Sequence, residues 1–154
     1  MSIDKVRVYL EKWGRGGDIR IMKTSTATVA LAAEALGIEG ARIAKTISLR
    51  DGDEAMVIVM AGDARLQNRK FRDRFGFKPK MLTAEEALEL TGHAVGGVCP
   101  FALPKVVKIY LDESLKRFET VFPACGSADS AIELTVDELS EYTGCPEWVD
   151  TCTI

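Results

Sequence analysis

Residues 43–60 have the sequence IAKTISLRDGDEAMVIVM, in which two apolar stretches flank the dipeptide Asp51-Gly52. The stretches, Ile43–Leu49 and Ala55–Met60, are rich in the β-branched and large apolar residues that favour strands. An Asp-Gly pair between two such stretches is typical of a tight turn, because both residues tolerate the positive φ that the turn requires. We therefore expect an antiparallel hairpin at this point.

The rest of the chain adds helices and strands on both sides of this hairpin. Helical spacing of apolar residues or a capping residue predicts helices at 3–13, 27–36, 65–76, 83–92, 113–118 and 135–144. Strands are predicted at 18–22, 106–111, 120–122, 131–134 and 147–150. Strands follow one another directly as often as they alternate with helices. This favours an α+β fold with a mixed, mainly antiparallel, β-barrel-like sheet flanked by helices.

The composition is that of an ordinary globular protein. The chain has 154 residues, of which 47% are apolar and 28% charged, and we expect residues 1–154 to form a single domain. It has no apolar run of transmembrane length and we expect no signal peptide, which favours a cytoplasmic protein without a membrane partner. Its four cysteines are irregularly spaced and predict free thiols; neither a metal nor another cofactor is expected.

A glycine-rich stretch, Gly92–Pro104, is the first candidate for chemistry. It contains three glycines, two prolines, the only histidine of the chain and one cysteine. Helices and central strands do not tolerate this composition, because glycine costs backbone entropy and proline removes an N–H donor. The stretch is therefore a loop, and its apolar residues distinguish it from a simple solvated connection. Such a loop can bring bare backbone N–H groups close to a ligand.

Lys45 is the second candidate. Side chains alternate along a strand, so Lys45 shares one face with the apolar Ile43 and Ile47. A buried ammonium group is costly without an anionic or polar partner. One interpretation is an edge-strand lysine whose stem runs out to solvent. The other is a lysine that projects into a pocket and holds a phosphate or a carbonyl oxygen.

Several blocks, in the same order along the chain, resemble the YbaK/prolyl-tRNA editing domain family. They are Thr24–Val29, Ala32–Gly37, Ile43–Ile47, Gly96–Phe101, Tyr110–Leu115 and Ala131–Leu134. Gly96 and Pro100 match the Gly-x-x-x-Pro pattern of the family's glycine-rich loop. The resemblance extends from Ile19 to Gly144, and the ordered set of blocks is more specific than any block alone.

The resemblance implies a mixed β-barrel flanked by helices and the hydrolysis of mischarged aminoacyl-tRNA, often in trans to a synthetase. In that family the lysine that matches Lys45 orients the aminoacylated end of the tRNA, and backbone amides of the glycine-rich loop hold the ester carbonyl. The loop residues concerned are Gly96, Gly97, Val98, Cys99 and Pro100. The substrate's own 2′-hydroxyl helps to activate water or, with a cysteinyl substrate, its thiol attacks. Cys-tRNA(Pro) or Ala-tRNA(Pro) is the expected substrate, and prolyl-tRNA synthetase is a candidate partner.

Further residues are predicted to contact the substrate. Thr24, Ser25 and Thr26 are candidate helix caps, and the helix N-terminus that follows them could also bind a phosphate. Phe101 belongs to the loop block. Asp129 and Ser130 lie in a glycine-containing turn, where the family carries polar pocket residues, although turn chemistry alone also explains them.

A basic stretch from Arg65 to Lys80 contains seven basic residues and one acid, although the whole chain has a net charge of −3. A solvated helix face is the commonest explanation of such a stretch. With a tRNA substrate, the alternative is contact with the phosphate backbone. The candidate residues are Arg65, Arg69, Lys70 and Arg72.

Two other functions remain open from the sequence. Cys99 beside His93 is compatible with a cysteine-dependent hydrolase, although a free cysteine in an apolar setting is usually inert. The chain could also be a non-catalytic module that binds tRNA ends or a synthetase. The sequence offers no convincing catalytic triad, which suits a substrate-assisted reaction.

Overall fold

The computed structural model describes residues 2–154. Its α-helices are Ser2–Leu10 (α1), Val29–Leu36 (α2), Asn68–Phe75 (α3), Ala84–Thr91 (α4) and Val136–Tyr142 (α5). Short 3₁₀ helices occupy Glu11–Trp13, Gly16–Asp18, Gly40–Arg42 and Glu113–Arg117. The strands are Arg20–Ile21 (β1), Ile43–Asp51 (β2), Glu54–Ala61 (β3), Arg65–Leu66 (β4), Lys108–Asp112 (β5), Thr120–Pro123 (β6), Ser130–Ala131 (β7), Leu134–Thr135 (β8), Glu147–Val149 (β9) and Cys152–Thr153 (β10).

A six-stranded sheet with the order β8-β6-β2-β3-β5-β9 forms the centre of the molecule. It is built on the predicted hairpin, in which β2 and β3 pair antiparallel from Ala44 opposite Ala61 to Asp51 opposite Glu54. β6 joins β2, β5 joins β3 and β9 joins β5 in parallel, whereas β8 runs antiparallel to β6. The hairpin and the mixed sheet are thus confirmed. The parallel pairs arise because helical segments intervene before the chain returns to the sheet.

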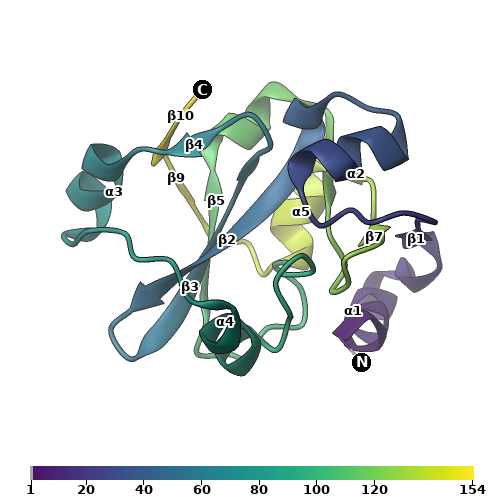
Figure 1. The fold of residues 1–154 in the computed structure, drawn as a ribbon, viewed down its shortest axis with the longest axis horizontal. Helices are drawn as coiled ribbons and strands as arrows, with labels where there is room; N and C mark the ends of the chain where they lie inside the picture. Colours follow the sequence, from purple (N-terminus) through teal and green to yellow (C-terminus); the bar gives the residue numbers. More distant parts are fainter. Residues whose placement is uncertain (1) are drawn as a thin grey trace.

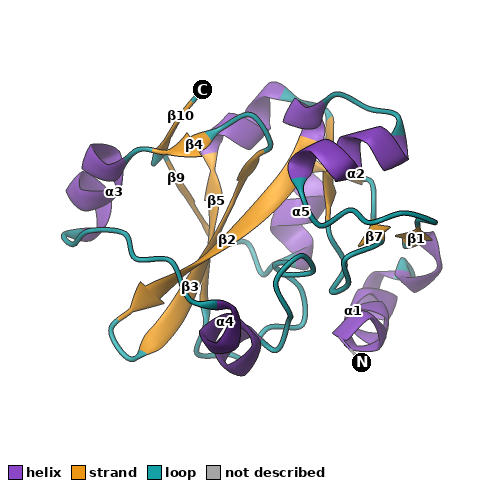
Figure 2. Ribbon diagram, in the orientation of Figure 1, coloured by secondary structure: helices purple, strands orange, loops and turns teal. Residues whose placement is uncertain are grey.

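The sheet curls into a half-barrel with helices around it (Figure 1). Its edges are β8 and β9, so the barrel is open. Two small antiparallel sheets, β1 with β7 and β4 with β10, extend it on opposite sides. Figure 2 shows α3 at the left of the molecule, and α2, β1 and β7 at the right. The basic helix α3 is therefore remote from the region around α2.

The core surrounds β3, in which every residue from Ala55 to Ala61 is buried. An inner strand that is covered on both faces needs an almost continuous apolar sequence, which explains the run AMVIVMA. The main core cluster also takes in Leu10 of α1 and Leu139 of α5. The helices on this side of the sheet are therefore held by apolar packing.

Two predicted helix starts are confirmed by their capping geometry. The Thr83 hydroxyl accepts from the N–H of Glu86, whose carboxylate accepts from the Thr83 N–H in return. Thr135 and Glu138 form the same reciprocal pair at the start of α5. Each pair satisfies backbone N–H groups that a helix start leaves without partners.

The predicted cap of α2 among Thr24–Thr26 is wrong. α2 begins after Thr28, whose side chain accepts from the Leu31 N–H at 3.2 Å. The N–H of Thr26 instead donates to the Ala128 carbonyl at 2.6 Å. This contact with a distant turn keeps the preceding segment extended, which the local sequence does not reveal.

Other element boundaries also differ from the prediction because the deciding partners are distant in sequence. The expected strand at 18–22 is reduced to β1, after a 3₁₀ turn. The basic stretch opens as β4, paired with β10, and only Asn68–Phe75 is helical. The expected strand at 131–134 is divided into β7 and β8, and the segment at 113–117 is a 3₁₀ helix.

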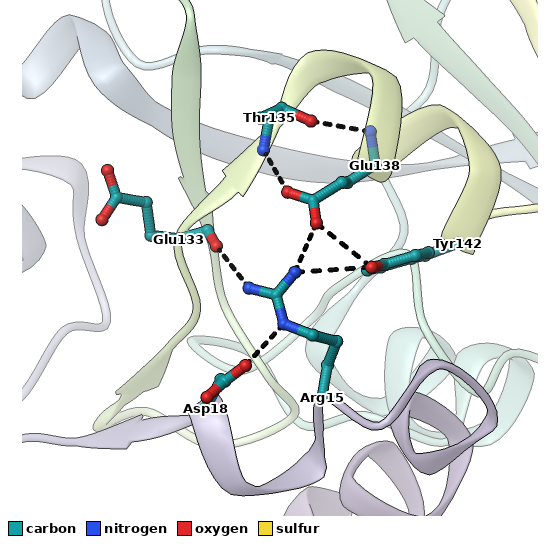
Figure 3. Close-up of polar contacts among 6 residues, drawn as sticks. All are labelled: Arg15, Asp18, Glu133, Thr135, Glu138 and Tyr142. Carbon is teal, nitrogen blue, oxygen red and sulfur yellow. Dashed lines mark hydrogen bonds and ion pairs between the residues drawn. The ribbon is translucent and has the colours of Figure 1, made fainter.

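Arg15 joins the segment after α1 to α5 (Figure 3). Its guanidinium donates to the carboxylates of Asp18 and Glu138, both at 2.5 Å. It also donates to the Glu133 carbonyl at 3.3 Å and to the Tyr142 hydroxyl at 3.4 Å. Because Glu138 also caps α5, one guanidinium connects the N-terminal region to the start of the last helix.

Candidate functional site

A pocket opens where the sheet divides between β2 and β6. These strands pair only at Ile43 and Ala44 and then diverge. The pocket has a volume of about 380 Å³, near the small end of the usual range for ligand sites. Its walls come from five regions. They are Thr26–Val29 at the start of α2, Lys45–Ser48 of β2, Met81, Leu82 and Ala87 around α4, Val95, Gly96 and Val98 of the glycine-rich loop, and Phe122, Ala124, Ser130 and Ala131 from β6 to β7.

The middle of β2 presents backbone groups to this pocket. Further along the strand, the Ser48 carbonyl accepts from the Leu82 N–H at 3.1 Å. The Arg50 N–H donates to the Lys80 carbonyl at 2.8 Å. The even-numbered residues of β2 therefore turn their backbone groups away from β3. By the same alternation, the N–H and C=O of Thr46 face the pocket.

Lys45 is half-buried in the wall of the pocket. β2 is an inner strand in the sheet order, but β6 has left it at Lys45, and there the lysine lines the pocket. Burial lowers the pKa of the Lys45 ammonium, and the nearby Asp63 carboxylate opposes this effect. Its Nζ donates to the Gly62 carbonyl at 3.4 Å. This one long hydrogen bond leaves most of the donor capacity of an ammonium group for a ligand.

Two glycines allow the loop to pass close to its neighbours. Gly96 has a φ of +94°, and a Cβ at this position would lie 3.1 Å from the Cβ of Ala27. A Cβ on Gly97 would lie 2.7 Å from the amide nitrogen of Ser127. Real Cβ atoms do not approach backbone so closely. The loop therefore packs between the start of α2 and the 126–128 turn only with glycine at these positions.

The loop offers fewer amides than the family resemblance implies. The Gly97 N–H donates to the Ala94 carbonyl at 2.9 Å, and Pro100 has no N–H. Gly97 and Pro100 thus cannot hold an ester carbonyl as expected. Gly96 and Val98 line the pocket, and their amides have no hydrogen-bond acceptor within residues 2–154. Of the loop residues predicted to hold the ester carbonyl, Gly96 and Val98 are therefore the two in the pocket lining with unpartnered amides.

His93 and Cys99 belong to the loop, and both are fully buried. His93 Nε2 lies 2.8 Å from the Phe101 carbonyl oxygen and 3.5 Å from Cys99 Sγ. Burial lowers the pKa of His93, and burial raises the pKa of the Cys99 thiol to about 12. Both groups are therefore neutral near physiological pH. A cysteine nucleophile needs a thiolate with access to substrate, so this geometry does not support a cysteine-dependent hydrolase.

Phe101 anchors the loop in the core and does not reach the pocket. Its side chain is fully buried, with its ring 6.2 Å from that of Tyr9. The predicted contact between Phe101 and substrate is therefore wrong. The apolar end of the loop is turned into the core, where its burial contributes to stability.

The turn after β6 forms another part of the wall. The Ser127 hydroxyl lies 2.7 Å from both Asp129 Oδ1 and Ser130 Oγ. Ser130 is buried and lines the pocket. Asp129 lies outside the lining, and its carbonyl accepts from the Met22 N–H at 2.7 Å. Ser130 is thus held in the wall, while Asp129 stabilises the turn.

Of the three residues Thr24–Thr26, only Thr26 lines the pocket. Thr24 is exposed. The Ser25 hydroxyl donates to the Ala128 carbonyl at 3.3 Å and accepts from the Ala27 N–H at 3.1 Å. Ser25 therefore shapes the segment that brings Thr26 into the wall.

The predicted tRNA-backbone residues lie outside the pocket lining. Arg69 and Arg72 border a separate hollow on α3. Lys70 Nζ pairs with Asp150 at 3.1 Å and donates to the Cys152 carbonyl at 2.8 Å, so it attaches α3 to the C-terminal strand.

Arg65 is the member of this set that lies close to the pocket. It is exposed on β4. The pKa of Lys45 is lowered mainly by the burial of Lys45, and the positive charge of Arg65 lowers it further. The basic stretch therefore does not form one continuous surface around the pocket.

Sequence reasoning missed Thr46 and the wall supplied by α4. A threonine within a strand is ordinary, and no local pattern distinguishes Thr46 from Ser48 or Thr120. The role of Thr46 becomes apparent only from the three-dimensional structure, in which β6 diverges from β2 after Ala44. The helical pattern around Leu82 and Ala87 is explained equally well by core residues, so it does not indicate a pocket wall.

The described residues show neither a metal centre nor a membrane span. Within residues 2–154, no three metal-binding side chains are grouped so that they could hold an ion. The cysteines are free, and of them only Cys145 is exposed. In the same range, no helix has the length and apolar character to cross a bilayer.

Comparison with known proteins places this pocket within a recognised domain. The sequence model of the aminoacyl-tRNA editing domain matches residues 23–142, a range that includes every residue of the pocket. YwhH, an uncharacterized protein of Bacillus subtilis strain 168, is 53% identical over 153 residues, which are 99% of this chain and 98% of YwhH.

Two further relatives are named for prolyl-tRNA. The proline–tRNA ligase of Halalkalibacterium halodurans is 31% identical over 104 residues, which cover 67% of this chain but 18% of the ligase. A crystal structure described as that of a candidate trans-editing enzyme for prolyl-tRNA synthetase superposes with a TM-score of 0.88 and 31% identity. The superposition covers 99% of this chain and 98% of that one, so the fold is shared throughout.

Proposed function

Because the chain belongs to the aminoacyl-tRNA editing domain family, we propose that it hydrolyses the ester bond of mischarged aminoacyl-tRNA in trans to a synthetase. The observation that carries the proposal is the meeting of Lys45, Gly96 and Val98 in one pocket, although they are far apart in sequence. An aminoacyl ester is already activated. A site that positions it and stabilises the oxyanion therefore needs no nucleophilic side chain.

In the proposed reaction, water attacks the ester carbonyl carbon and the bond from this carbon to the ribose oxygen breaks. The ribose oxygen takes up a proton, and the products are the free amino acid and uncharged tRNA. The amides of Gly96 and Val98 donate to the developing oxyanion. One such donor typically lowers the barrier by about 3–4 kcal/mol. The 2′-hydroxyl of the substrate assists the attacking water, as the family resemblance implies.

Lys45 is assigned to the tRNA end of the substrate. Its ammonium lies in the wall with one weak protein contact, so it can bind a phosphate or ribose oxygen of the terminal nucleotide. A charge in this position orients the ester relative to the two amides. Lys45 therefore contributes by positioning the substrate rather than by proton transfer.

A small amino acid esterified to tRNA(Pro) is the proposed substrate, with cysteine and alanine as the first candidates. The names of two relatives support the link to prolyl-tRNA. The pocket volume of about 380 Å³ supports a small aminoacyl group. Prolyl-tRNA synthetase is the proposed partner, and Arg65, Arg69 and Arg72 are proposed to contact the tRNA backbone through non-specific charge neutralisation.

The test is a deacylation assay on tRNA(Pro) charged with cysteine, alanine or proline, measured as release of the amino acid. We expect the wild-type chain to release at least one of the small non-cognate amino acids and to spare proline. Lys45→Ala should lower kcat/KM about a hundredfold, the effect of losing a hydrogen bond to a charged group. Lys108→Ala, which removes an exposed lysine of β5 outside the pocket lining, is the matched control and should not change turnover.

Two outcomes would contradict the proposal. Wild-type turnover in a folded Lys45→Ala protein would overturn the role of Lys45. Tight binding of the charged tRNAs without release of any amino acid would overturn the deacylase and favour the non-catalytic binding module.

A further inference from the structure

The hydroxyl side chains around the pocket differ in whether they have partners. Thr28 accepts from the Leu31 N–H as the cap of α2, and Ser130 bonds to Ser127. Thr26 and Thr46 differ from these, because their buried Oγ1 atoms have no hydrogen-bond partner within residues 2–154. Both residues line the pocket.

An unpartnered buried hydroxyl is unusual in a folded protein. Most buried polar side-chain atoms are hydrogen-bonded, and a group without a partner loses its hydration without compensation. No hydrogen bond would be broken if either threonine turned about its Cα–Cβ bond, which moves the hydroxyl from one staggered position to another. Either hydroxyl can thus be presented to a ligand in the pocket.

The two threonines lie beside the groups assigned to the ester. Thr46 follows Lys45 on β2, so its backbone adjoins Lys45 while its side chain lies on the other face of the strand. Thr26 precedes Ala27, whose Cβ is the nearest atom to the position that a Cβ on Gly96 would occupy. The side chain of an aminoacyl ester branches only one carbon from the carbonyl. A substrate whose carbonyl is held by the Gly96 amide therefore places its side chain near these residues.

We propose that Thr26 and Thr46 are specificity-determining residues that favour an aminoacyl group with a hydroxyl or thiol on Cβ. Seryl and cysteinyl esters are then preferred over alanyl esters. This inference rests on the proposed deacylase function and refines its substrate class. A serine hydroxyl both donates and accepts, so it satisfies either threonine, whereas a thiol does so more weakly and a methyl group not at all.

The selection is expected to be substantial because binding alanine would leave the threonine hydroxyls unpaired. Sites built to bond a substrate hydroxyl discriminate strongly against analogues that lack it, whereas purely apolar pockets do not. We expect the order serine, cysteine, alanine in kcat/KM, with about a tenfold preference for serine over alanine for each hydroxyl engaged.

The test uses Thr26→Val and Thr46→Val, which keep the shape of the side chain and remove the hydroxyl. The control is Thr143→Val, because Thr143 lies outside the pocket lining. Thr26 and Thr143 are both 7% exposed, but the Thr143 hydroxyl donates to the Leu139 carbonyl at 2.7 Å. Each protein is assayed on tRNA(Pro) charged with serine, cysteine or alanine, and its thermal unfolding is measured without substrate.

The two pocket variants should lower the serine-to-alanine ratio of kcat/KM about tenfold each, while Thr143→Val leaves it unchanged. Without substrate, the pocket variants should unfold at the wild-type temperature or above it, since they remove an unpaired polar group. Thr143→Val should unfold about 2–4 °C lower.

The possible results distinguish a failure of the proposed deacylase function from a failure of the roles assigned to Thr26 and Thr46. If the wild-type chain releases none of the three amino acids, the deacylase itself is overturned. If it releases them but the pocket variants keep the wild-type ratio, the assignment of Thr26 and Thr46 is overturned while the deacylase stands. A fall in unfolding temperature of the pocket variants to match Thr143→Val would also overturn it, because the hydroxyls would then have partners in the protein.

Discussion

His93 Nε2 lies 2.8 Å from the carbonyl oxygen of Phe101. This hydrogen bond spans the glycine-rich loop, since His93 stands near its start and Phe101 near its end. The Nε2–H donates to the carbonyl, which leaves Nδ1 to accept from the Ser2 hydroxyl on α1. A neutral imidazole thus ties the two ends of the loop to each other and to the N-terminal helix.

The role of His93 predicts a pH dependence of stability. Burial lowers the pKa of His93 in the folded state below the ordinary value of about 6.5. The unfolded state therefore takes up a proton at a higher pH than the folded state. The stabilisation from the neutral imidazole is present above about pH 6.5 and is lost as the pH falls from there through the folded-state pKa.

Urea unfolding of the wild type and of His93→Gln, at about pH 7.5 and about pH 5.5, measures this contribution. Glutamine can still donate to the Phe101 carbonyl, but it does not titrate. We expect the variant to be less stable by about 1–2 kcal/mol at the higher pH and the difference to shrink at the lower pH. An equal difference at both values would contradict the neutral, buried imidazole.

The cysteines should react with thiol reagents at very different rates. Cys145 is exposed, whereas Cys99 is fully buried and its thiol has a pKa raised to about 12 by burial. Because the thiolate is the reactive form, we expect fast alkylation at Cys145 only. Mass spectrometry of the folded protein and of Cys145→Ser checks the site, and turnover should survive the modification. Rapid labelling of Cys99 with loss of turnover would restore the cysteine nucleophile.

Gly97 should tolerate no side chain. A Cβ there would lie 2.7 Å from the Ser127 amide nitrogen, so Gly97→Ala must displace the loop or the turn. Overpacking of this kind costs about 1–3 kcal/mol, and displacement of the Gly96 and Val98 amides should lower kcat more than it raises KM. Gly17→Ala is the matched control, because neither glycine has a positive φ and no atom lies within 4 Å of a Cβ at Gly17. Equal activity of the two variants would contradict the close packing.

Local chemistry in the sequence predicted the parts of the fold that depend on neighbouring residues. The hairpin predicted at Asp51-Gly52 forms, although its two turn residues are Gly52 and Asp53, because Asp51 pairs with Glu54. The capping box that begins at Thr83 lies where expected, because it is decided within a few residues. The predicted start of α2, by contrast, is wrong. The observed start depends on a hydrogen bond from the Thr26 N–H to Ala128, a residue that lies at the other end of the sequence.

The candidate site, like the fold, could be predicted only in part from the sequence. Lys45 broke the pattern of an apolar strand face, and Gly96 broke the pattern of regular structure, so both were visible in the sequence. Thr46 was not, because its importance arises from the divergence of β6 from β2. Phe101 stood in the right loop but on its buried side, and composition alone does not give the direction of a side chain.

The last prediction concerns Arg15, whose guanidinium bonds to Asp18 of the N-terminal segment, to the Glu133 carbonyl before β8 and to Glu138 and Tyr142 of α5. Arg15→Met should lower the free energy of unfolding by about 2 kcal/mol, the usual effect of losing hydrogen bonds to charged groups that are partly buried. Arg15→Lys should recover little of this loss, because a single ammonium cannot reach several acceptors that are arranged around a planar fork.

Urea unfolding checks these values, with Lys116→Met as the control. Lys116 forms an exposed pair with Glu113 within one short helix, and such pairs contribute little. The Arg15 variants should retain deacylation at a temperature where they remain folded, because Arg15 lies outside the pocket lining. If Arg15→Lys were as stable as the wild type, the planar geometry of the guanidinium would not matter, and a single charge would account for the link between the N-terminal segment and α5.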